Sequence, residues 1–339
     1  MFRPRKIPSV AVWLLTGLTL GTVAHVDVAI AQASSKPKVV ATNAILCDLA
    51  KQIAKNSVEL TCLMEPGQDP HLYEMRPADR RAIEQAKLVL YGGYRYAPAI
   101  EKAIKAANNG STKVAVYEIA TPKPRKSSGH HHHGEEKGKG HDHDHDHDHS
   151  KEKKAEPKVA DAHIWHNVKN TRAMLKVLRR NLIKIQPKST FQYIDRTKAL
   201  NDELKRLDEW IQAQVKTVPD DKRVLITSHD AMGYYADAYG FKVQSALGAI
   251  STEERPSAKQ VKLVVDAVRK SGVKTVFAET AYKTRLIEIM AREADVKVAE
   301  KRLFVEGLGQ PESGADTYQK MMRHNTCVIV TGLGGKCQS

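Results

Sequence analysis

Cysteine is scarce in this sequence, and its spacing excludes a common class of metal site. The chain has four cysteines, Cys47, Cys62, Cys327 and Cys337, and none of them forms a CxxC pair with another. The most local disulfide pairing joins Cys47 to Cys62 and Cys327 to Cys337. Three connectivities are possible with four cysteines, and free thiols are not excluded.

Long apolar runs are also lacking beyond the N-terminal segment. That segment combines a basic start (FRPRK), an apolar stretch too short to span a bilayer comfortably, and the small residues of AIAQA. These features predict a cleavable signal peptide over residues 1–31, with cleavage after Ala31 or Ala33. No cysteine directly follows the cleavage point, so we expect no lipid-anchored form. We expect an exported protein in an oxidising compartment, where disulfides persist.

Acidic residues are outnumbered, since 54 Lys and Arg against 39 Asp and Glu give a formal charge of +15. Such an excess is typical of nucleic-acid binding. Here, however, the basic residues are spread along helical segments such as KNTRAMLKVLRRNLIK, opposite apolar positions. Aromatic residues make up only 6% of the chain, and no stacking platform or zinc-finger spacing is visible. We therefore expect solvated helix faces and no nucleic-acid partner.

What the chain does contain is a regular alternation of β-branched apolar runs with amphipathic segments. KPKVVATN, VELTCLM and KLVLYGG predict strands, ILCDLAKQIAK and PADRRAIEQA predict helices, and the same pattern resumes at RVLITSH. Further strands are expected over residues 113–120 and 296–305, and a last helix and strand within residues 318–333. Strands separated by single helices imply parallel sheets.

The expected fold class is α/β, with two (β/α) lobes of parallel sheet joined by a long rigid helix. The first lobe is predicted over residues 38–190, the linking helix over 191–217 and the second lobe over 218–339. Within the first lobe, the composition of residues 121–160 excludes a core and predicts a disordered insert. Open α/β sheets bind ligands at the carboxyl ends of their strands, which places the site in the cleft between the lobes.

The insert contains nine of the chain's 15 histidines, in the stretch SSGHHHHGEEKGKGHDHDHDHDHSKEKK over residues 127–154. Alternating imidazoles and carboxylates on a flexible chain offer several weak, exchangeable metal sites. A solvated linker is the alternative, whereas an affinity tag would sit at a terminus and lack interleaved aspartates. The candidate secondary ligands are His130, His131, His132, His133, His141, His143, His145, His147 and His149.

Three of the five remaining histidines of the mature chain lie at strand-to-helix junctions. His71 follows the strand that ends near Met64, His163 marks the return to order after the insert, and His229 ends the run VLITSH. A single histidine at such a junction would be interpreted as a hydrogen-bonded surface residue and not as a metal ligand. Three imidazoles that converge on a cleft, however, suit a borderline-soft divalent ion. His166, three residues after His163, is expected behind the ligands or exposed.

A carboxylate is expected to complete the site. Glu306 in RLFVEGLGQPESG follows the last strand-like run and precedes a glycine-rich loop, so it lies near the same cleft unless it is a solvated loop residue. Glu279, which ends the strand VFAET, is the second choice. His324, in MMRHN, is expected on a helix surface.

Several motifs in a fixed order carry a family resemblance. The segments GQDPHLYEMRPADRRAIEQAKLVLYGG, DAHIWHN, LITSHDAMGYYADAYG, VFAET and LFVEGLGQPESGADTYQKMMRHN resemble the metal-binding (cluster A-I) substrate-binding proteins of bacterial ABC importers. The His-rich insert resembles their zinc-specific ZnuA branch, and the likeness covers nearly all of residues 38–334. It implies metal ligands at His71, His163 and His229, and it places the family's fourth ligand, often Asp, at Glu306. A further departure is the alanine of DAHIW, where the family commonly has proline.

The resemblance also bears on the identity of the metal. Manganese-binding relatives tend to use a carboxylate at the position of His229, whereas three neutral imidazoles with at most one carboxylate suit tetrahedral Zn²⁺. Manganese remains an alternative, and copper(II) binds the same nitrogens strongly under the Irving–Williams order. The implied function is capture of Zn²⁺ in the periplasm by a monomer that delivers it to an ABC permease and its ATPase. The insert, which ends immediately before His163, would hold metal at high effective concentration near the site.

Two other classes of function compete with this interpretation. A zinc-dependent hydrolase would also use three histidines and an open position, with Glu306 as the only candidate base. The sequence has no HExxH, GxSxG or P-loop motif, so we expect that the protein is not an enzyme. An adhesin or a periplasmic metal buffer that never meets a transporter is the second competitor.

Overall fold

Four short parallel strands with β-branched cores form the sheet of the first half. The computed structural model describes residues 36–128, 158–227, 229–245, 258–281 and 284–338; the nine insert histidines and the expected signal peptide lie outside these ranges. The strand order is β2-β1-β3-β4, and all three pairings are parallel. The central strands are buried, as expected for parallel sheets with helices on their faces. The strands are β1 (Lys38–Ala41), β2 (Glu59–Cys62), β3 (Leu88–Tyr91) and β4 (Thr112–Ala115).

The helices of this half begin at recognisable signals. Asn43 caps the first helix, because its side chain accepts a hydrogen bond from the Leu46 N–H at 3.0 Å. Pro77 and Pro98 occupy the first turns of the next two helices, where their missing N–H groups cost nothing. The elements are α1 (Ala44–Ala54), η1 (Lys55–Ser57), α2 (Pro77–Gln85), α3 (Pro98–Ala106) and α4 (Val116–Ala120).

The two ends of the His-rich insert are tied together by a short hairpin. β5 (Lys126–Ser128) and β6 (Lys158–Ala160) pair antiparallel, with Ser128 opposite Lys158. The chain then passes through η2 (Ile164–His166) into α5 (Val168–Ile185), which is capped by the Asn167 side chain. The insert therefore leaves and rejoins the fold at neighbouring positions.

The second half repeats the β/α pattern with shorter strands. β7 pairs with β8 and β9 with β10, both in parallel, and parallel bridges at Thr227–Phe277 and Glu279–Leu303 extend the pairing. Gly240 ends α7 in the left-handed conformation. The elements are η4 (Asp220–Lys222), β7 (Val224–Thr227), α7 (Gly233–Tyr239), β8 (Lys242–Ser245), α8 (Ala258–Ser271), β9 (Thr275–Val276), α9 (Arg285–Ala294), β10 (Lys297–Val298), η5 (Pro311–Ser313) and α10 (Tyr318–Gly332).

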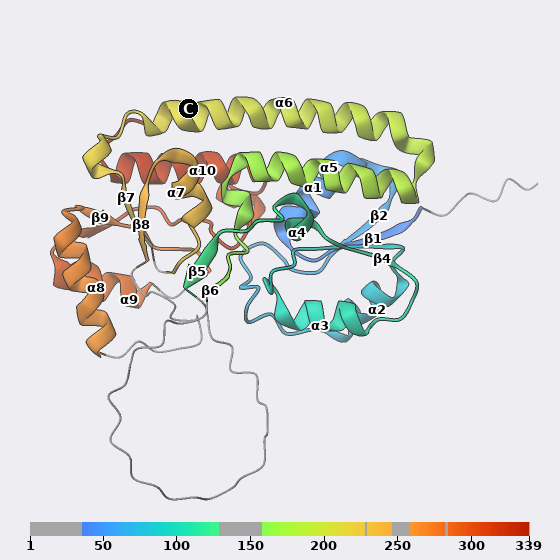
Figure 1. Cartoon of the computed structure of the whole chain (residues 1–339), viewed down its shortest axis with the longest axis horizontal. Coiled ribbons are helices and arrows are strands. Elements are labelled where there is room, and N and C mark those ends of the chain that lie inside the picture. Colours follow the sequence, from blue (N-terminus) through green and yellow to red (C-terminus); the bar gives the residue numbers. More distant parts are fainter. Residues whose placement is uncertain (1–35, 129–157, 228, 246–257, 282–283, 339) are drawn as a thin grey trace, which may run out of the picture. The chain divides into compact units, whose positions relative to one another are not determined.

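One long helix contacts both halves. After η3 (Pro187–Ser189), α6 runs over Thr190–Val215, about 39 Å at 1.5 Å per residue. It packs against α1 and α5 of the first half and against α7 and α10 of the second, and Figure 1 shows it lying along α5 and α10. Its inner face buries Leu200, Leu204 and Ile211. The expected α/β class, with parallel sheets and a long helix, is confirmed.

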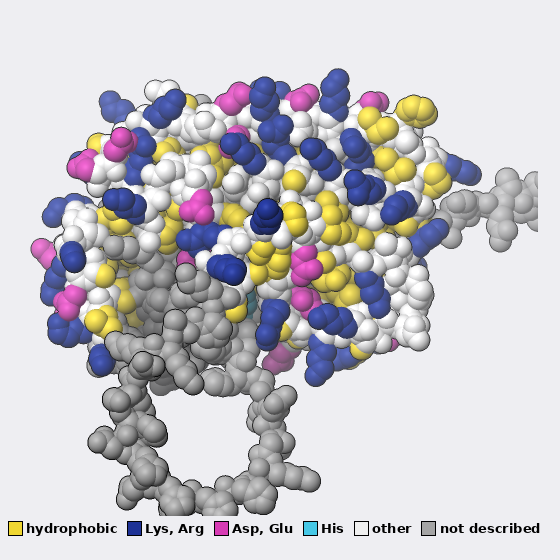
Figure 2. All heavy atoms as spheres, in the orientation of Figure 1, with side chains coloured by type: hydrophobic (Ala, Val, Ile, Leu, Met, Phe, Trp, Pro, Cys, Tyr) yellow, Lys and Arg dark blue, Asp and Glu magenta, His cyan; other side chains and the backbone are white. Residues whose placement is uncertain are grey.

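The cysteines pair as the most local connectivity predicts, Cys47 with Cys62 and Cys327 with Cys337. Among the described residues, no helix is both long and apolar enough to cross a membrane. Figure 2 shows Lys and Arg scattered over the visible face with Asp and Glu among them, as expected for solvated helix faces.

Three expected strands differ from the structure. Residues 296–305 form a strand only at Lys297–Val298, with an isolated bridge at Leu303. Residues 113–120 form a strand only as far as Ala115, because the chain turns into α4, which buries Val116 and Tyr117. The run CVIV, expected to continue into a strand, lies inside α10, where Val328, Ile329 and Val330 are buried. A short apolar run does not by itself distinguish a strand from a buried helix segment.

Candidate metal site

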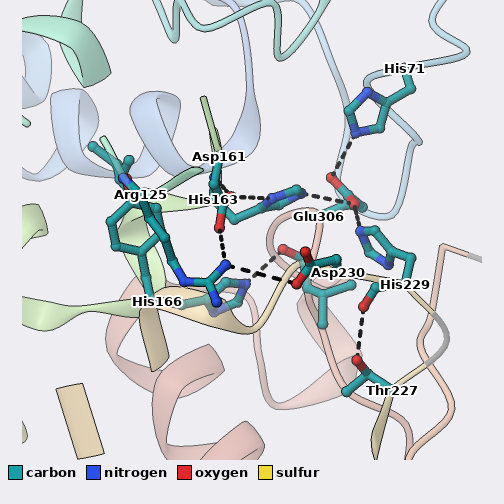
Figure 3. A network of polar contacts seen from close by, with 12 residues as sticks. His71, Arg125, Asp161, His163, His166, Thr227, His229, Asp230 and Glu306 are labelled. Carbon is teal, nitrogen blue, oxygen red and sulfur yellow. Dashed lines mark hydrogen bonds and ion pairs between the residues drawn. The ribbon is translucent and has the colours of Figure 1, made fainter. Parts of the chain in front are cut away.

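Four loops bring the four candidate ligands together. His71 lies after β2, His163 immediately before η2, His229 two residues after β7, and Glu306 beyond the bridge residue Leu303. Figure 3 shows the three imidazoles pointing toward the Glu306 carboxylate from different sides. The site thus takes residues from both halves of the sequence, at the carboxyl ends of strands, as open α/β sheets favour.

The distances place Glu306 at the centre of the cluster. Its Oε1 lies 2.7 Å from His229 Nε2 and 3.3 Å from His163 Nε2, and its Oε2 lies 4.0 Å from His71 Nε2. Ligand atoms of His71, His163 and Glu306 all fall within 4.8 Å of one another. His163, His229 and Glu306 are buried, and His71 is the most accessible of the four. Three nitrogens and a carboxylate at this spacing match the donor set of a four-coordinate metal ion.

On the side away from Glu306, the His163 and His229 rings each contact a carboxylate of their own. Asp161 Oδ1 accepts from the backbone N–H of His163 and lies 2.9 Å from its Nδ1. Glu279 likewise accepts from the His229 N–H and lies 2.5 Å from its Nδ1. These contacts fix the rings with Nε2 facing Glu306, which is how carboxylates orient and strengthen histidine ligands. Glu279, the second-choice ligand, is therefore on the wrong side of His229 to share a metal ion with Glu306.

His71 and Glu306 are positioned by different contacts. Asp69 Oδ1 accepts from the His71 backbone N–H at 2.9 Å. Tyr96, which is buried, donates its hydroxyl to the Glu306 carbonyl oxygen at 2.6 Å, and its ring packs edge-on against His71 and His163. A hydrogen bond from the first half thus holds the loop that presents Glu306.

The charges in the cluster shift its titration strongly. Burial alone would lower the pKa of His163, but the Glu306 and Asp161 carboxylates outweigh it and raise that pKa to about 9. The pKa of His229 is also raised well above its usual range, because Glu279 and Glu306 overcome burial. Burial would raise the pKa of Glu306, but His163 and His229 hold it well below its usual range. The cluster therefore binds protons at neutral pH that a metal ion must displace.

A cavity of about 260 Å³ adjoins the site and gives access to it. His71, Asp161, His163 and Asp230 are among its lining residues. A larger cavity of about 1350 Å³ lies elsewhere, and its lining includes Trp210, residues of α10 and the lysines Lys297 and Lys301. The smaller cavity is the one that reaches the cluster, since its lining includes His71 and His163 together with Arg95.

The other two histidines lie outside the cluster. His166 is fully buried, not exposed, and its Nε2 lies 2.9 Å from the Val305 carbonyl oxygen, next to Glu306. Burial lowers its pKa to about 4, so the neutral ring donates to that carbonyl. His324 lies on α10, half-buried, and bonds the Arg302 carbonyl oxygen.

Sequence reasoning missed three residues that shape the site: Asp161, Tyr96 and Arg125. Asp161 had a detectable signal, because both DPH and DAH place Asp two residues before a candidate ligand. Tyr96 and Arg125 act across long sequence separations and had none.

Comparisons with known proteins show the family and the fold of the chain. Residues 39–332 match the model of the family described as zinc-uptake complex component A, periplasmic. The chain is 28% identical to the zinc-binding protein TroA of Treponema pallidum, over 89% of this chain and 91% of that protein. The solved TroA structure superimposes with a TM-score of 0.74 at 26% identity, covering 88% of this chain and 99% of that one.

Of two further relatives, one is named for no particular metal and the other for manganese. The metal ABC transporter substrate-binding lipoprotein FimA of Streptococcus parasanguinis is 30% identical over 97% of this chain and 99% of its own length. The manganese-binding lipoprotein MntA of Bacillus subtilis is 27% identical over 89% of this chain and 91% of its own.

Proposed function

The chain belongs to the family of periplasmic zinc-uptake component A proteins, and from this membership and the site geometry we propose that it captures Zn²⁺ and delivers it to an ABC permease. The family consists of metal-binding substrate-binding proteins of ABC importers, which work with a permease and an ATPase and are not enzymes. The proposed ligands are His71, His163, His229 and Glu306.

The observation that carries the choice of zinc is the donor set around Glu306. Three Nε2 atoms and one carboxylate make an N₃O set, which suits Zn²⁺ in tetrahedral coordination. Manganese prefers a larger share of oxygen ligands. Sequence identity does not discriminate, since the relatives named for zinc and for manganese are 28% and 27% identical to this chain. The ligand chemistry of this chain is what supports zinc in this proposal.

Equilibrium competition between zinc, manganese and copper tests this proposal. The full chain would be stripped of metal, dialysed against equal free concentrations of the three ions and analysed for bound metal. We expect zinc to displace manganese, because imidazole nitrogen binds zinc more strongly. Retention of manganese in the presence of equal free zinc would contradict the assignment.

The His-rich insert is proposed to collect zinc without forming the tight site. Its ends are held side by side by the β5–β6 pairing, so metal bound there stays near His163. Because Ser128 is paired with Lys158, residues 129–157 can be replaced by an Asn-Gly turn without changing that register. We expect the trimmed protein to keep one tight zinc and to lose the additional weaker sites in a calorimetric titration. Loss of the tight site in the trimmed protein would show that the insert contributes to tight binding, which would contradict this proposal.

We also propose a periplasmic location, reached through the cleavable signal over residues 1–31, and a monomeric state. The support is the sequence of the N-terminal segment, the family description and the two disulfides, which persist in oxidising compartments. N-terminal sequencing of the exported protein would show whether it begins after Ala31 or Ala33, and light scattering would show its mass.

A further inference from the structure

Arg125 lies at the start of the β5–β6 hairpin and is surrounded by three carboxylates. Its Nη1 lies 3.8 Å from Asp161 Oδ2 and 4.0 Å from Asp230 Oδ1, and its Nε donates to Asp237 Oδ2 at 3.2 Å. Its backbone N–H donates to the Tyr234 hydroxyl at 2.8 Å. Asp230, Tyr234 and Asp237 all belong to the second half, in α7 and the loop before it, so Arg125 joins the two halves of the sequence.

Two of these carboxylates are adjacent to proposed metal ligands. Asp161 holds the His163 ring through its Oδ1 while its Oδ2 faces Arg125. Asp230 directly follows His229 in the chain. Figure 3 shows the guanidinium between Asp161 and Asp230. One cation therefore touches the supports of two ligands that come from different halves.

The Asp161 contact is more than an ordinary surface ion pair. The Asp161 side chain is 1% exposed, and its Oδ2 has no hydrogen-bond partner among the described residues. A buried carboxylate needs a nearby cation to offset its desolvation, and Arg125 provides the charge from 3.8 Å. The Asp237 contact, at a side chain 64% exposed, is of the weak surface kind.

The absence of a side chain at Gly233 leaves room for the Arg125 guanidinium. A Cβ added at Gly233 would lie 2.6 Å from Arg125 Nε and would overlap the rest of the guanidinium. Gly233 is the first residue of α7, where alanine would otherwise favour the helix. The glycine thus allows α7 to approach Arg125 closely.

We propose that Arg125 is a positioning residue that clasps the His163 and His229 loops together and thereby slows release of the bound metal. This inference rests on the proposed function. Arg125 holds Asp161 against His163, and through Asp230 it restrains the loop that presents His229. Without the guanidinium the two loops separate more easily, and the metal loses ligands from one half at a time.

Zinc release from the full chain tests this clasp. Each protein would be loaded with one equivalent of zinc, and release would be followed after mixing with excess chelator. Arg125→Gln removes the cation, and Gly233→Ala displaces it while keeping every charge. We expect release to be at least about fivefold faster in both, the lower end of ordinary coupling between sites. Arg172→Gln, which breaks the bond from Arg172 Nε to Asn201 on α6, is the matched control and should release zinc at the wild-type rate.

A purely structural role makes a different prediction. Arg125→Gln would then lower the melting temperature of the metal-stripped protein while leaving the release rate and the zinc-dependent rise in melting temperature unchanged. Unchanged release from either variant overturns the clasp, and if Arg125→Gln does not fold, Gly233→Ala decides. Failure of the wild-type protein to bind one equivalent of zinc would instead overturn the proposed function.

Discussion

At the scale of single residues, the site depends on which nitrogen of each imidazole is already bonded. Asp161 and Glu279 take the Nδ1 atoms of His163 and His229, so Nε2 is the nitrogen left for a metal in both rings. Glu306 then faces both Nε2 atoms. This arrangement fixes the direction of each proposed ligand, and it makes Nε2 the nitrogen that must lose its proton when metal binds.

Replacing one imidazole at a time should separate ligands from other histidines. We expect His71→Ala, His163→Ala and His229→Ala each to weaken zinc binding by more than about 100-fold, because loss of a ligand exceeds the 10–100-fold cost of losing its supporting contact. The matched control is His324→Ala. His324 lies on α10 and its ring bonds the Arg302 carbonyl oxygen. Chelator competition measures the affinities. A His324→Ala loss as large as the others would show that the effect is not specific to the cluster.

The metal preference should follow the donor at position 229. Changing His229 to Asp alone would place a new carboxylate beside buried Glu279, and the two like charges would repel. The double variant His229→Asp with Glu279→Gln avoids this and makes the set richer in oxygen. We expect its ratio of zinc to manganese affinity to fall by about tenfold or more, measured by competition dialysis. An unchanged ratio would mean that His229 does not set the preference.

The pH dependence follows from the raised pKa of His163. Coordination requires loss of the Nε2 proton, and that pKa is about 9, so zinc affinity should fall as pH decreases below about 9. The expected slope is about tenfold per pH unit for each proton displaced. The same shift stabilises chelator-treated protein below the unfolded histidine pKa of about 6.5, and this contribution is lost as pH rises through about 9. Zinc affinity that is flat from about pH 7 to pH 9 would contradict this account.

The sequence placed His71, His163, His229 and Glu306 at the ends of strand-like runs, and the structure brings them together; their role as ligands stays a prediction. Parallel strands present their carboxyl ends at one edge, which explains the placement of His71, His229 and Glu306. His163 instead follows β6, which pairs antiparallel with β5. Arg125 and Tyr96 were not predicted. Arg125 meets Asp237 across 112 positions and Tyr96 meets Glu306 across 210, and such contacts leave no local pattern.

At the scale of elements, the site is held by loops whose ends are fixed by strands and capped helices. Predictions from periodicity succeeded where a segment was long and amphipathic, as in α5 and α6. They failed in α4 and at the end of α10, where short apolar runs of β-branched residues are buried as helix. Tertiary packing outweighs local propensity there.

Helix α6 should stabilise both halves through its buried face. Leu204 is fully buried, so Leu204→Ala should lower the free energy of unfolding by about 2–5 kcal/mol. Phe191 lies on the same helix but is 80% exposed, and Phe191→Ala should change it by less than about 0.5 kcal/mol. Urea unfolding followed by tryptophan fluorescence compares them. Equal effects would show that burial on α6 does not determine stability.

At the scale of the whole molecule, the described residues share a core that crosses the sequence midpoint. One hydrophobic cluster includes Val40 and Leu90 from the first half and Leu225, Phe277 and Met321 from the second. A second cluster packs α8 and α9. A shared core and the continuous α6 restrict hinge motion, so metal binding should move loops more than lobes.

Solution scattering measures the size of that motion. We expect the radius of gyration of the insert-trimmed protein to change by less than about 1 Å between chelator-treated and zinc-loaded samples, within the range of rearrangement common for preorganised binding. The trimmed protein is used because compaction of the insert on metal would itself change the radius. A decrease of several ångströms would indicate closure of whole lobes.

Zinc K-edge X-ray absorption of the full chain tests the central claim most directly. With half an equivalent of zinc, the ion occupies the tightest site. We expect a four-coordinate first shell at about 2.0–2.1 Å, with outer-shell scattering from three imidazoles. We also expect a carboxylate contribution, which should be lost in Glu306→Ala. A six-coordinate shell of oxygens, or fewer than three imidazoles, would contradict the central claim.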